Sequence, residues 1–442
     1  MSKRAGGDAA GIPGHVFDPC RRRLVNGLAA AGTLGALAPG LLLPARAQAA
    51  GRTVRIGFVS PRTGPLAPFG EADPFVIAGV SPLLEKGIVI NGVSYPVRII
   101  GKDSQSNPNR AAEVTASLIK SDKVDLVLAG STADTVNPVS DQCEINGVPC
   151  ITNDAPWQPY FFGRGGKSDK GFEWTYHFFW GLEDLVAVFA KLWNSVPNNK
   201  VVGALWPNDA EGNAFADAKT GFPPALAAAG FKLVDAGRFQ PTTNDFSAQI
   251  GAFRSAGVEI VTGVLPPPAF ATFWSQAAQQ GFKPKVATVA KALLFPAAVE
   301  ALGDRAIGLT TEVWWSPDHP FKSGLTGQTA GQLCAAYEEA TKKQWTQPLG
   351  FRHALFELAV DVLKRTRNID SKASIRDAIR ETSYNSIVGP VAWSGKPVRN
   401  VTRTPLVGGQ WVAGRKFKYE LVVVNNDTGK SVPVRQKMAP LS

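Results

Sequence analysis

The tripeptide Gly130-Ser131-Thr132 is the part of this sequence whose residue types best suit binding of a small anion. It stands where an apolar strand over residues 124–129 ends and a helical pattern begins. The first N–H groups of a helix have no partner within it, and neighbouring hydroxyls add donors, so a carboxylate removed from water can be satisfied there without a full countercharge. The simpler interpretation is that Ser131 and Thr132 only cap their helix.

Motifs for catalysis are incomplete in this sequence. Gly166-Lys167-Ser168 resembles the end of a phosphate-binding loop, but the glycine required five positions before Gly166 is replaced by Phe161. The four histidines stand far apart, and zinc-protease, nucleophile-elbow and paired-cysteine motifs are missing. The sequence therefore predicts that the protein is not an enzyme and uses no cofactor or metal, although a triad assembled from distant residues stays open.

The first 47 residues have the pattern of an export signal. Arg21-Arg22-Arg23 precedes an apolar, small-residue stretch over residues 28–43, and Pro44-Ala45-Arg46-Ala47 supplies a cleavage pattern. We expect a twin-arginine-type signal over residues 1–47, cleavage near Ala47 and a periplasmic mature chain. An uncleaved membrane anchor is the alternative, but glycines and prolines interrupt the apolar stretch.

The charge of the mature chain gives no indication of a nucleic-acid partner. Removal of residues 1–47 takes away six basic and two acidic residues, which lowers the formal net charge from +11 to +7. The remaining charges of both signs are interleaved over nearly the whole length, so we interpret them as a solvated surface. Because no later segment has 18 continuous apolar residues, we expect no membrane span in the mature chain.

Two of the three cysteines left after processing are close together in sequence. Cys143 and Cys150 flank a helix end, a glycine turn and a strand start. In an oxidising periplasm they are candidates for a disulfide, and two small buried thiols are the alternative.

Strand patterns fall into two groups, and helical patterns separate the strands within each group. The first group covers residues 54–60, 97–101, 124–129 and 148–151. The second covers residues 201–205, 232–236, 259–263 and 285–289. Alternating strands and helices predict parallel sheets with right-handed crossovers, and two such sets predict two doubly wound α/β lobes.

The rest of the chain, from residue 306 onward, is expected to return to both lobes. The chain then crosses between the lobes three times, and these three segments form the hinge. We expect the first lobe to comprise residues 52–175 plus 306–388 and the second lobe residues 176–305 plus 389–442. The mature chain is longer than a single hydrophobic core usually supports. A cleft between two lobes is the default position for a binding site.

Several short motifs carry a resemblance to a known family. In chain order they are Ile56-Gly57-Phe58, Gly64-Pro65-Leu66, Phe69-Gly70, Gly130-Ser131-Thr132, Gly147-Val148-Pro149, Asn208–Gly212 and Ser386–Ala392. Together they resemble the branched-chain amino acid (Leu/Ile/Val) binding protein family, the type I periplasmic solute receptors of ABC importers. The resemblance implies two lobes that close on a small solute and present it to a membrane permease, and it implies a monomer.

The resemblance also implies ligand contacts from both lobes. The residues at matching positions are Phe69, Ser131, Thr132, Asp154, Ala155 and Trp157 in the first lobe and Trp206, Glu211 and Lys291 in the second. Two of them depart from the family pattern. Glu211 replaces the usual aromatic residue, with Trp206 beside it, and Lys291 stands where receptors for amino acids have a carboxylate for the ligand's ammonium group. As alternatives, Trp206 is core, Glu211 is solvated and Lys291 is exposed.

A lysine in the cleft would repel an ammonium group and attract an anion. The solute is therefore expected to be a branched-chain or other amino acid, or an organic or aromatic acid. Aromatic residues are dense over residues 157–180, and they either stack on a planar ligand or form core between the lobes. A sensory module that passes its closed state to a signalling receptor is the alternative function.

Overall fold

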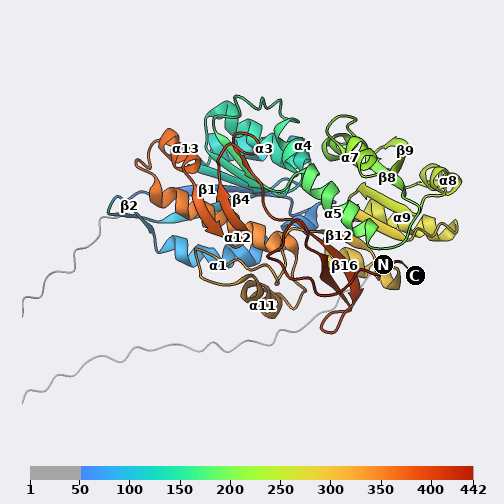
Figure 1. Cartoon of the computed structure of the whole chain (residues 1–442). Helices are drawn as coiled ribbons and strands as arrows, with labels where there is room; N and C mark the ends of the chain where they lie inside the picture. Colours follow the sequence, from blue (N-terminus) through green and yellow to red (C-terminus); the bar gives the residue numbers. More distant parts are fainter. Residues whose placement is uncertain (1–50, 442) are drawn as a thin grey trace, which may run out of the picture. The chain divides into compact units, whose positions relative to one another are not determined.

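The computed structural model describes residues 51–441, and these residues form two α/β lobes built on separate sheets (Figure 1). The predicted export signal over residues 1–47 lies outside the described residues.

The first lobe contains a six-stranded parallel sheet with the order β15-β7-β6-β5-β1-β4. Its strands are β1 (Val54–Ser60), β4 (Val97–Asp103), β5 (Leu126–Gly130), β6 (Cys150–Asn153), β7 (Thr175–Phe178) and β15 (Val401–Thr402). All five residues of β5 and all but one of β1 are buried. Such continuous apolar strands are typical of a parallel sheet, because helices cover both of its faces.

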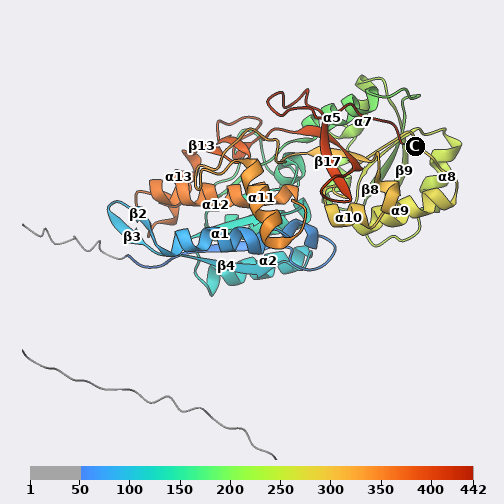
Figure 2. The same ribbon diagram turned by 90° about the horizontal axis from the view of Figure 1, so that it is seen from below.

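The helices of the first lobe divide between the two faces of this sheet. Side chains of α2 and α3 share a core with Val127 and Ala129, whereas those of α1 and α12 share the other core with Leu126 and Leu128. Helix α12 lies beside both α1 and α11 (Figure 2). The helices are α1 (Asp73–Glu85), α2 (Pro108–Lys120), α3 (Ala133–Asn146), α4 (Trp157–Phe161), α11 (Ala330–Thr341), α12 (Gln347–Arg365) and α13 (Lys372–Arg380). Two hairpins accompany them, β2 (Ile88–Ile90) with β3 (Val93–Tyr95) and β13 (Ser383–Ser386) with β14 (Gly389–Ala392).

The second lobe contains a seven-stranded sheet with the order β17-β16-β12-β11-β10-β8-β9, in which β16 and β17 run antiparallel to the others. Its strands are β8 (Val201–Pro207), β9 (Lys232–Phe239), β10 (Ile260–Val264), β11 (Val286–Ala290), β12 (Thr310–Val313), β16 (Val407–Ala413) and β17 (Tyr419–Asn425). Its helices are α5 (Leu182–Asn194), α6 (Ala210–Phe215), α7 (Phe222–Ala228), α8 (Ser247–Ser255), α9 (Pro267–Gln279) and α10 (Pro296–Glu300). Helix α5 packs against α7 and against β12, β16 and β17.

The chain crosses between the sheets three times, at positions that differ from those expected from the sequence. It leaves the first sheet after β7, leaves the second after β12, and crosses again between β15 and β16. The first predicted boundary fell within β7, and the other two fell before β12 and β15. Residues 176–178 and 389–402 were therefore assigned to the second lobe, and residues 306–313 to the first. Residue types identify a strand but do not say which of two sheets it joins, and that choice depends on pairing partners far away in sequence.

Cys143 in α3 and Cys150 in β6 are free and buried, so the predicted disulfide is not formed in the structure. Burial raises the pKa of the Cys143 thiol well above its ordinary value. The two residues belong to the small core between α2, α3 and the first sheet.

Within residues 51–441, every helix is too short or too polar to span a bilayer.

Candidate ligand-binding site

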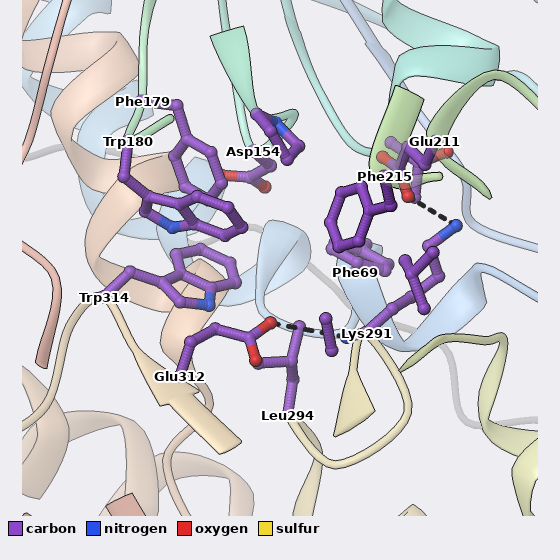
Figure 3. A pocket seen from close by; sticks show the side chains of 14 residues that line it. Phe69, Asp154, Phe179, Trp180, Glu211, Phe215, Lys291, Leu294, Glu312 and Trp314 are labelled. Carbon is purple, nitrogen blue, oxygen red and sulfur yellow. Dashed lines mark hydrogen bonds and ion pairs between the residues drawn. The ribbon is translucent and has the colours of Figure 1, made fainter. Parts of the chain in front are cut away.

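A small pocket lies where the carboxyl ends of strands from both sheets meet (Figure 3). The residues that line it are Phe69, Thr132, Asp154, Pro156, Phe179, Trp180, Glu211, Phe215, Val264, Ala290, Lys291, Leu294, Glu312 and Trp314. All of them stand at the end of a parallel strand or in the segment that follows it, which is where ligands bind in open α/β sheets. The space open to the centres of water molecules is small, about 20 Å³.

Aromatic side chains form much of the pocket wall. Phe179 packs against Trp180 and Trp314, with ring centroids 4.7 Å and 5.0 Å apart respectively. Both indole rings line the pocket (Figure 3), and neither Nε1 atom has a hydrogen-bond partner within residues 51–441. Phe69 and Phe215 complete the aromatic lining. The wall therefore offers flat apolar faces together with two unused N–H donors.

A buried ion pair stands at one end of the pocket. The Lys291 Nζ lies 2.5 Å from Glu211 Oε2 and 3.9 Å from Asp209 Oδ2. Burial acts to lower the pKa of Lys291, but the carboxylates of Glu211, Asp209 and Asp134 outweigh this and raise it above the ordinary lysine value. Burial raises the pKa of Glu211, and Lys291 opposes that rise. Lys291 is thus held as a cation inside the pocket.

Two reciprocal hydrogen bonds join the lobes beside this pair. The backbone N–H of Ala133, the first residue of α3, donates to Glu211 Oε1 at 3.0 Å. The backbone N–H of Ala210, the first residue of α6, donates to Asp134 Oδ1 at 3.2 Å. Each helix start therefore receives a carboxylate from the opposite lobe, an arrangement that the partial positive charge of helix N-termini favours.

Arg352 of α12 supports the pocket from behind and is fully buried. Its Nε lies 3.0 Å from Asp73 Oδ1, and its Nη1 lies 2.5 Å from Asp154 Oδ2. Its Nη2 donates to the carbonyl oxygens of Phe69 at 3.0 Å and Gly130 at 2.7 Å. A Cβ at Gly130 would collide with this guanidinium, so glycine is required there. One side chain thus fixes the segments that follow β1, β5 and β6.

Two further carboxyl groups face the pocket. Burial raises the pKa of Asp154 to about 6 despite the nearby Arg352, and the Asp154 Oδ1 atom has no partner in the described part of the chain. Burial also raises the pKa of Glu312 to about 7. The Glu312 carboxyl accepts the backbone N–H of Lys291 at 3.3 Å and the hydroxyl of Thr311 at 2.8 Å. Both groups are therefore more readily protonated than ordinary carboxyl groups.

Asp154 and Lys291 both have left-handed backbone conformations, with φ of 71° and 68°. Such conformations cost on the order of 1–3 kcal/mol for residues other than glycine and are concentrated at functional sites. They occur here directly after β6 and β11, where each turns a charged side chain into the pocket.

The structure brings five of the nine predicted site residues to the pocket wall. These are Phe69, Thr132, Asp154, Glu211 and Lys291. Ser131 is buried next to Thr132, and its hydroxyl has no partner within residues 51–441, but it does not line the pocket.

The other three predicted residues do not line the pocket, and each makes contacts elsewhere in the protein. Trp157, the first residue of α4, packs on Phe161 and Phe162, and its indole N–H donates to Glu183 at 3.0 Å. Trp206 lies on the core side of β8 and is fully buried. The backbone oxygen of Ala155 accepts the His177 Nε2–H at 2.7 Å. The alternatives, a solvated Glu211 and an exposed Lys291, are wrong, since both residues are buried.

Arg352, Glu312 and Trp314 belong to this site but were not predicted from the sequence. An arginine between the apolar residues Phe351 and Leu355 of the long helix α12 is a usable signal, because a charged side chain in a buried helix must find partners. Phe179 and Trp180 belong to the aromatic-rich segment noted in the sequence, and they line the pocket, whereas most other aromatic residues there are core.

The chain belongs to the periplasmic binding protein family, whose model matches residues 53–416. A curated relative is the Leu/Ile/Val-binding protein homolog 3 of Brucella melitensis, which is 26% identical over 215 residues. That match covers 49% of this chain and 55% of the relative, so it spans about half the length of each protein. The family is extracytoplasmic, and its members are binding proteins rather than enzymes.

Solved structures have the same fold. The leucine-binding protein of Thermotoga maritima is 18% identical with a TM-score of 0.69, and the match covers 85% of this chain and 99% of that one. A solute-binding protein of an ABC transporter from Rhodopseudomonas palustris, solved with 3,4-dihydroxybenzoic acid, is 18% identical with a TM-score of 0.66 and coverages of 86% and 99%. The two-lobe architecture is therefore that of the type I periplasmic binding proteins.

Proposed function

We propose that this protein is the solute receptor of an ABC importer and captures a small carboxylate-bearing solute in the pocket between its lobes. The observation that carries this proposal is the composition of the pocket, in which the start of α3, the Thr132 hydroxyl and the Lys291 ammonium group lie together. These are the donors and the cation that a buried carboxylate needs. Export to the periplasm with cleavage near Ala47, action as a monomer and delivery to a membrane permease belong to the same proposal.

The aromatic wall favours a flat solute among the candidate acids. Rings of Phe179, Trp180 and Trp314 offer faces for stacking, and the two indole N–H groups can bind a polar substituent. The similar structures include a protein named for leucine and one solved with 3,4-dihydroxybenzoic acid. A solute panel therefore begins with leucine, benzoate and 3,4-dihydroxybenzoate, and uses benzamide as the neutral control.

A thermal-shift and calorimetric titration of the mature chain tests this proposal. At least one carboxylate is expected to raise the melting temperature and to bind in calorimetry, because a ligand of the folded form stabilises it by mass action. Benzamide is expected to bind at least tenfold more weakly than benzoate. Equal binding of the acid and its amide, or no binding by an amino acid or organic acid, would remove the proposed carboxylate specificity.

The neighbouring hydroxyls of Ser131 and Thr132 provide a matched pair of variants. Thr132→Val is expected to weaken carboxylate binding about tenfold or more, since a hydrogen bond to a charged group contributes roughly 1.5–3 kcal/mol. Ser131→Ala is expected to change affinity less than threefold, because its hydroxyl is buried outside the pocket lining. Calorimetry on both variants checks this, and equal effects would show that Thr132 has no special role.

A further inference from the structure

Glu211 occupies the place at the start of α3 that a solute carboxylate would need. Its Oε1 accepts the N–H of Ala133 at 3.0 Å, and its Oε2 lies 2.5 Å from the Lys291 Nζ (Figure 3). Glu211 and Lys291 are both almost completely buried. The protein's own carboxylate thus has the partners that an external carboxylate would use.

The Thr132 hydroxyl at the same place has no partner. Thr132 is the residue before α3, it lines the pocket and only 1% of its surface is exposed, yet its Oγ1 has no hydrogen bond within the described residues. A buried hydroxyl without a partner is costly. The Glu211 carboxylate therefore satisfies only part of the donor set, and a better-placed anion would gain one more bond.

We propose that Glu211 is a built-in competitor for the solute's carboxylate. It binds the start of α3 and Lys291 and so joins the two lobes, and the solute's carboxylate displaces it and takes over both partners. This inference rests on the proposed function and adds a selection rule to it. A solute without an anionic group is expected to replace Glu211 poorly, because it would leave the buried Lys291 without its nearest countercharge and with only the more distant Asp209.

The geometry distinguishes this role from that of a receptor for an ammonium group. A carboxylate that binds the ammonium group of an amino acid must be free of other cations at that position, whereas Glu211 is in direct contact with Lys291. An ammonium group placed beside Glu211 would also face Lys291, and like charges at such short distance in a buried site repel strongly.

Acetate is a direct probe of the position that the Glu211 carboxylate leaves empty in Glu211→Ala, because it consists of a carboxylate and a single methyl group. In Glu211→Ala, Lys291 loses its 2.5 Å partner, so the variant is expected to melt at a lower temperature than the wild type. Acetate at 100 mM is expected to raise the melting temperature of the variant by about 2 °C or more beyond the effect of equal sodium chloride. Acetamide, the neutral isostere, is expected to have no such effect on the variant.

Two controls keep the acetate result interpretable. Glu259→Ala removes the acidic partner of the Lys285 ion pair (2.9 Å), which stands at the surface of the same lobe and away from the pocket. It should show no acetate-specific stabilisation, and neither should the wild type. If Glu211→Ala does not fold, Glu211→Gln replaces it and should show the same selective response at reduced size. An equal response to acetate, chloride and acetamide in the variants would overturn the proposal.

Calorimetry with leucine and 4-methylpentanoate, which is leucine without its ammonium group, supplies the second test. Removal of the competitor is expected to tighten the binding of both acids at least tenfold in Glu211→Ala. If Glu211 instead receives the ammonium group, leucine alone will bind more weakly in the variant, and that result would overturn the proposal. The acetate test needs no natural solute, so it decides on Glu211 even if no carboxylate in the panel binds the wild type and the proposed function fails.

Discussion

Replacement of Arg352 by alanine is expected to lower the free energy of unfolding by about 3–5 kcal/mol, the range found when one partner of a buried ion pair is removed. Arg352 is completely buried and pairs with Asp73 and Asp154, so the variant leaves two buried carboxylates without their cation. It also releases the carbonyl oxygens of Phe69 and Gly130 at the pocket. Chemical denaturation gives the stability, and calorimetry is expected to show that solute binding is lost as well.

The loss caused by Arg352→Ala should depend on pH in a definite direction. Burial already raises the pKa of Asp154 to about 6 in the presence of Arg352, and removal of the guanidinium raises it further. A carboxyl group whose pKa is higher in the folded state stabilises the fold at acid pH, and this contribution is lost as the pH rises through the folded pKa. The deficit relative to the wild type is therefore smallest at about pH 5 and largest above about pH 7.

Arg365→Ala is the matched control on the same helix. Arg365 pairs with Asp361 at 2.6 Å and donates to Ala378 and Thr382, but it is partly exposed and away from the pocket. Its removal should therefore cost clearly less stability than that of Arg352 and leave solute affinity unchanged. Similar losses for Arg352→Ala and Arg365→Ala, or a deficit that does not change with pH, would contradict the role assigned to Arg352.

Replacement of Lys291 by methionine is expected to weaken carboxylate binding 100- to 1,000-fold, or about 3–4 kcal/mol. Methionine keeps the length and apolar stem of the side chain but removes the ammonium group that neutralises Glu211 and Asp209. The variant pocket then repels an incoming anion instead of attracting it. Calorimetric titration with the tightest-binding acid of the panel measures this loss.

Lys285→Met provides the comparison for this second variant. Lys285 pairs with Glu259 at 2.9 Å and is half-exposed, so its replacement should change solute affinity less than twofold and stability by about 1 kcal/mol or less. An affinity loss below tenfold in Lys291→Met would place the solute's charge outside the reach of Lys291.

The sequence was sufficient to predict the type of fold and the position of most strands in the two main sheets. Parallel strands buried on both faces give continuous apolar runs such as residues 54–60, and the helices between them fix the crossover. What it could not supply was the assignment of short strands to a sheet. β7, β12 and β15 are four residues long or shorter, and which sheet each of them joins follows from tertiary pairing alone.

The site residues that could be predicted from the sequence are those in the segments after strands. Phe69, Thr132, Asp154, Glu211 and Lys291 all stand in the segments that follow strands, and the carboxyl ends of parallel strands meet at one edge. The role of Arg352 could not be predicted, because this residue comes from a helix about 200 residues after the β6 segment that it contacts. The side-chain direction that removes Trp157 from the pocket depends on the short helix α4, which is too short to give a periodic signal.

A crystal structure of the mature chain with the tightest-binding acid of the panel tests the central claim most directly. The account predicts the solute in the pocket between the lobes, with its carboxylate bound to the Ala133 N–H and the Thr132 hydroxyl and within ion-pair distance of Lys291. Density for the solute at any other place, or in this pocket with its carboxylate turned away from α3 and Lys291, would contradict it.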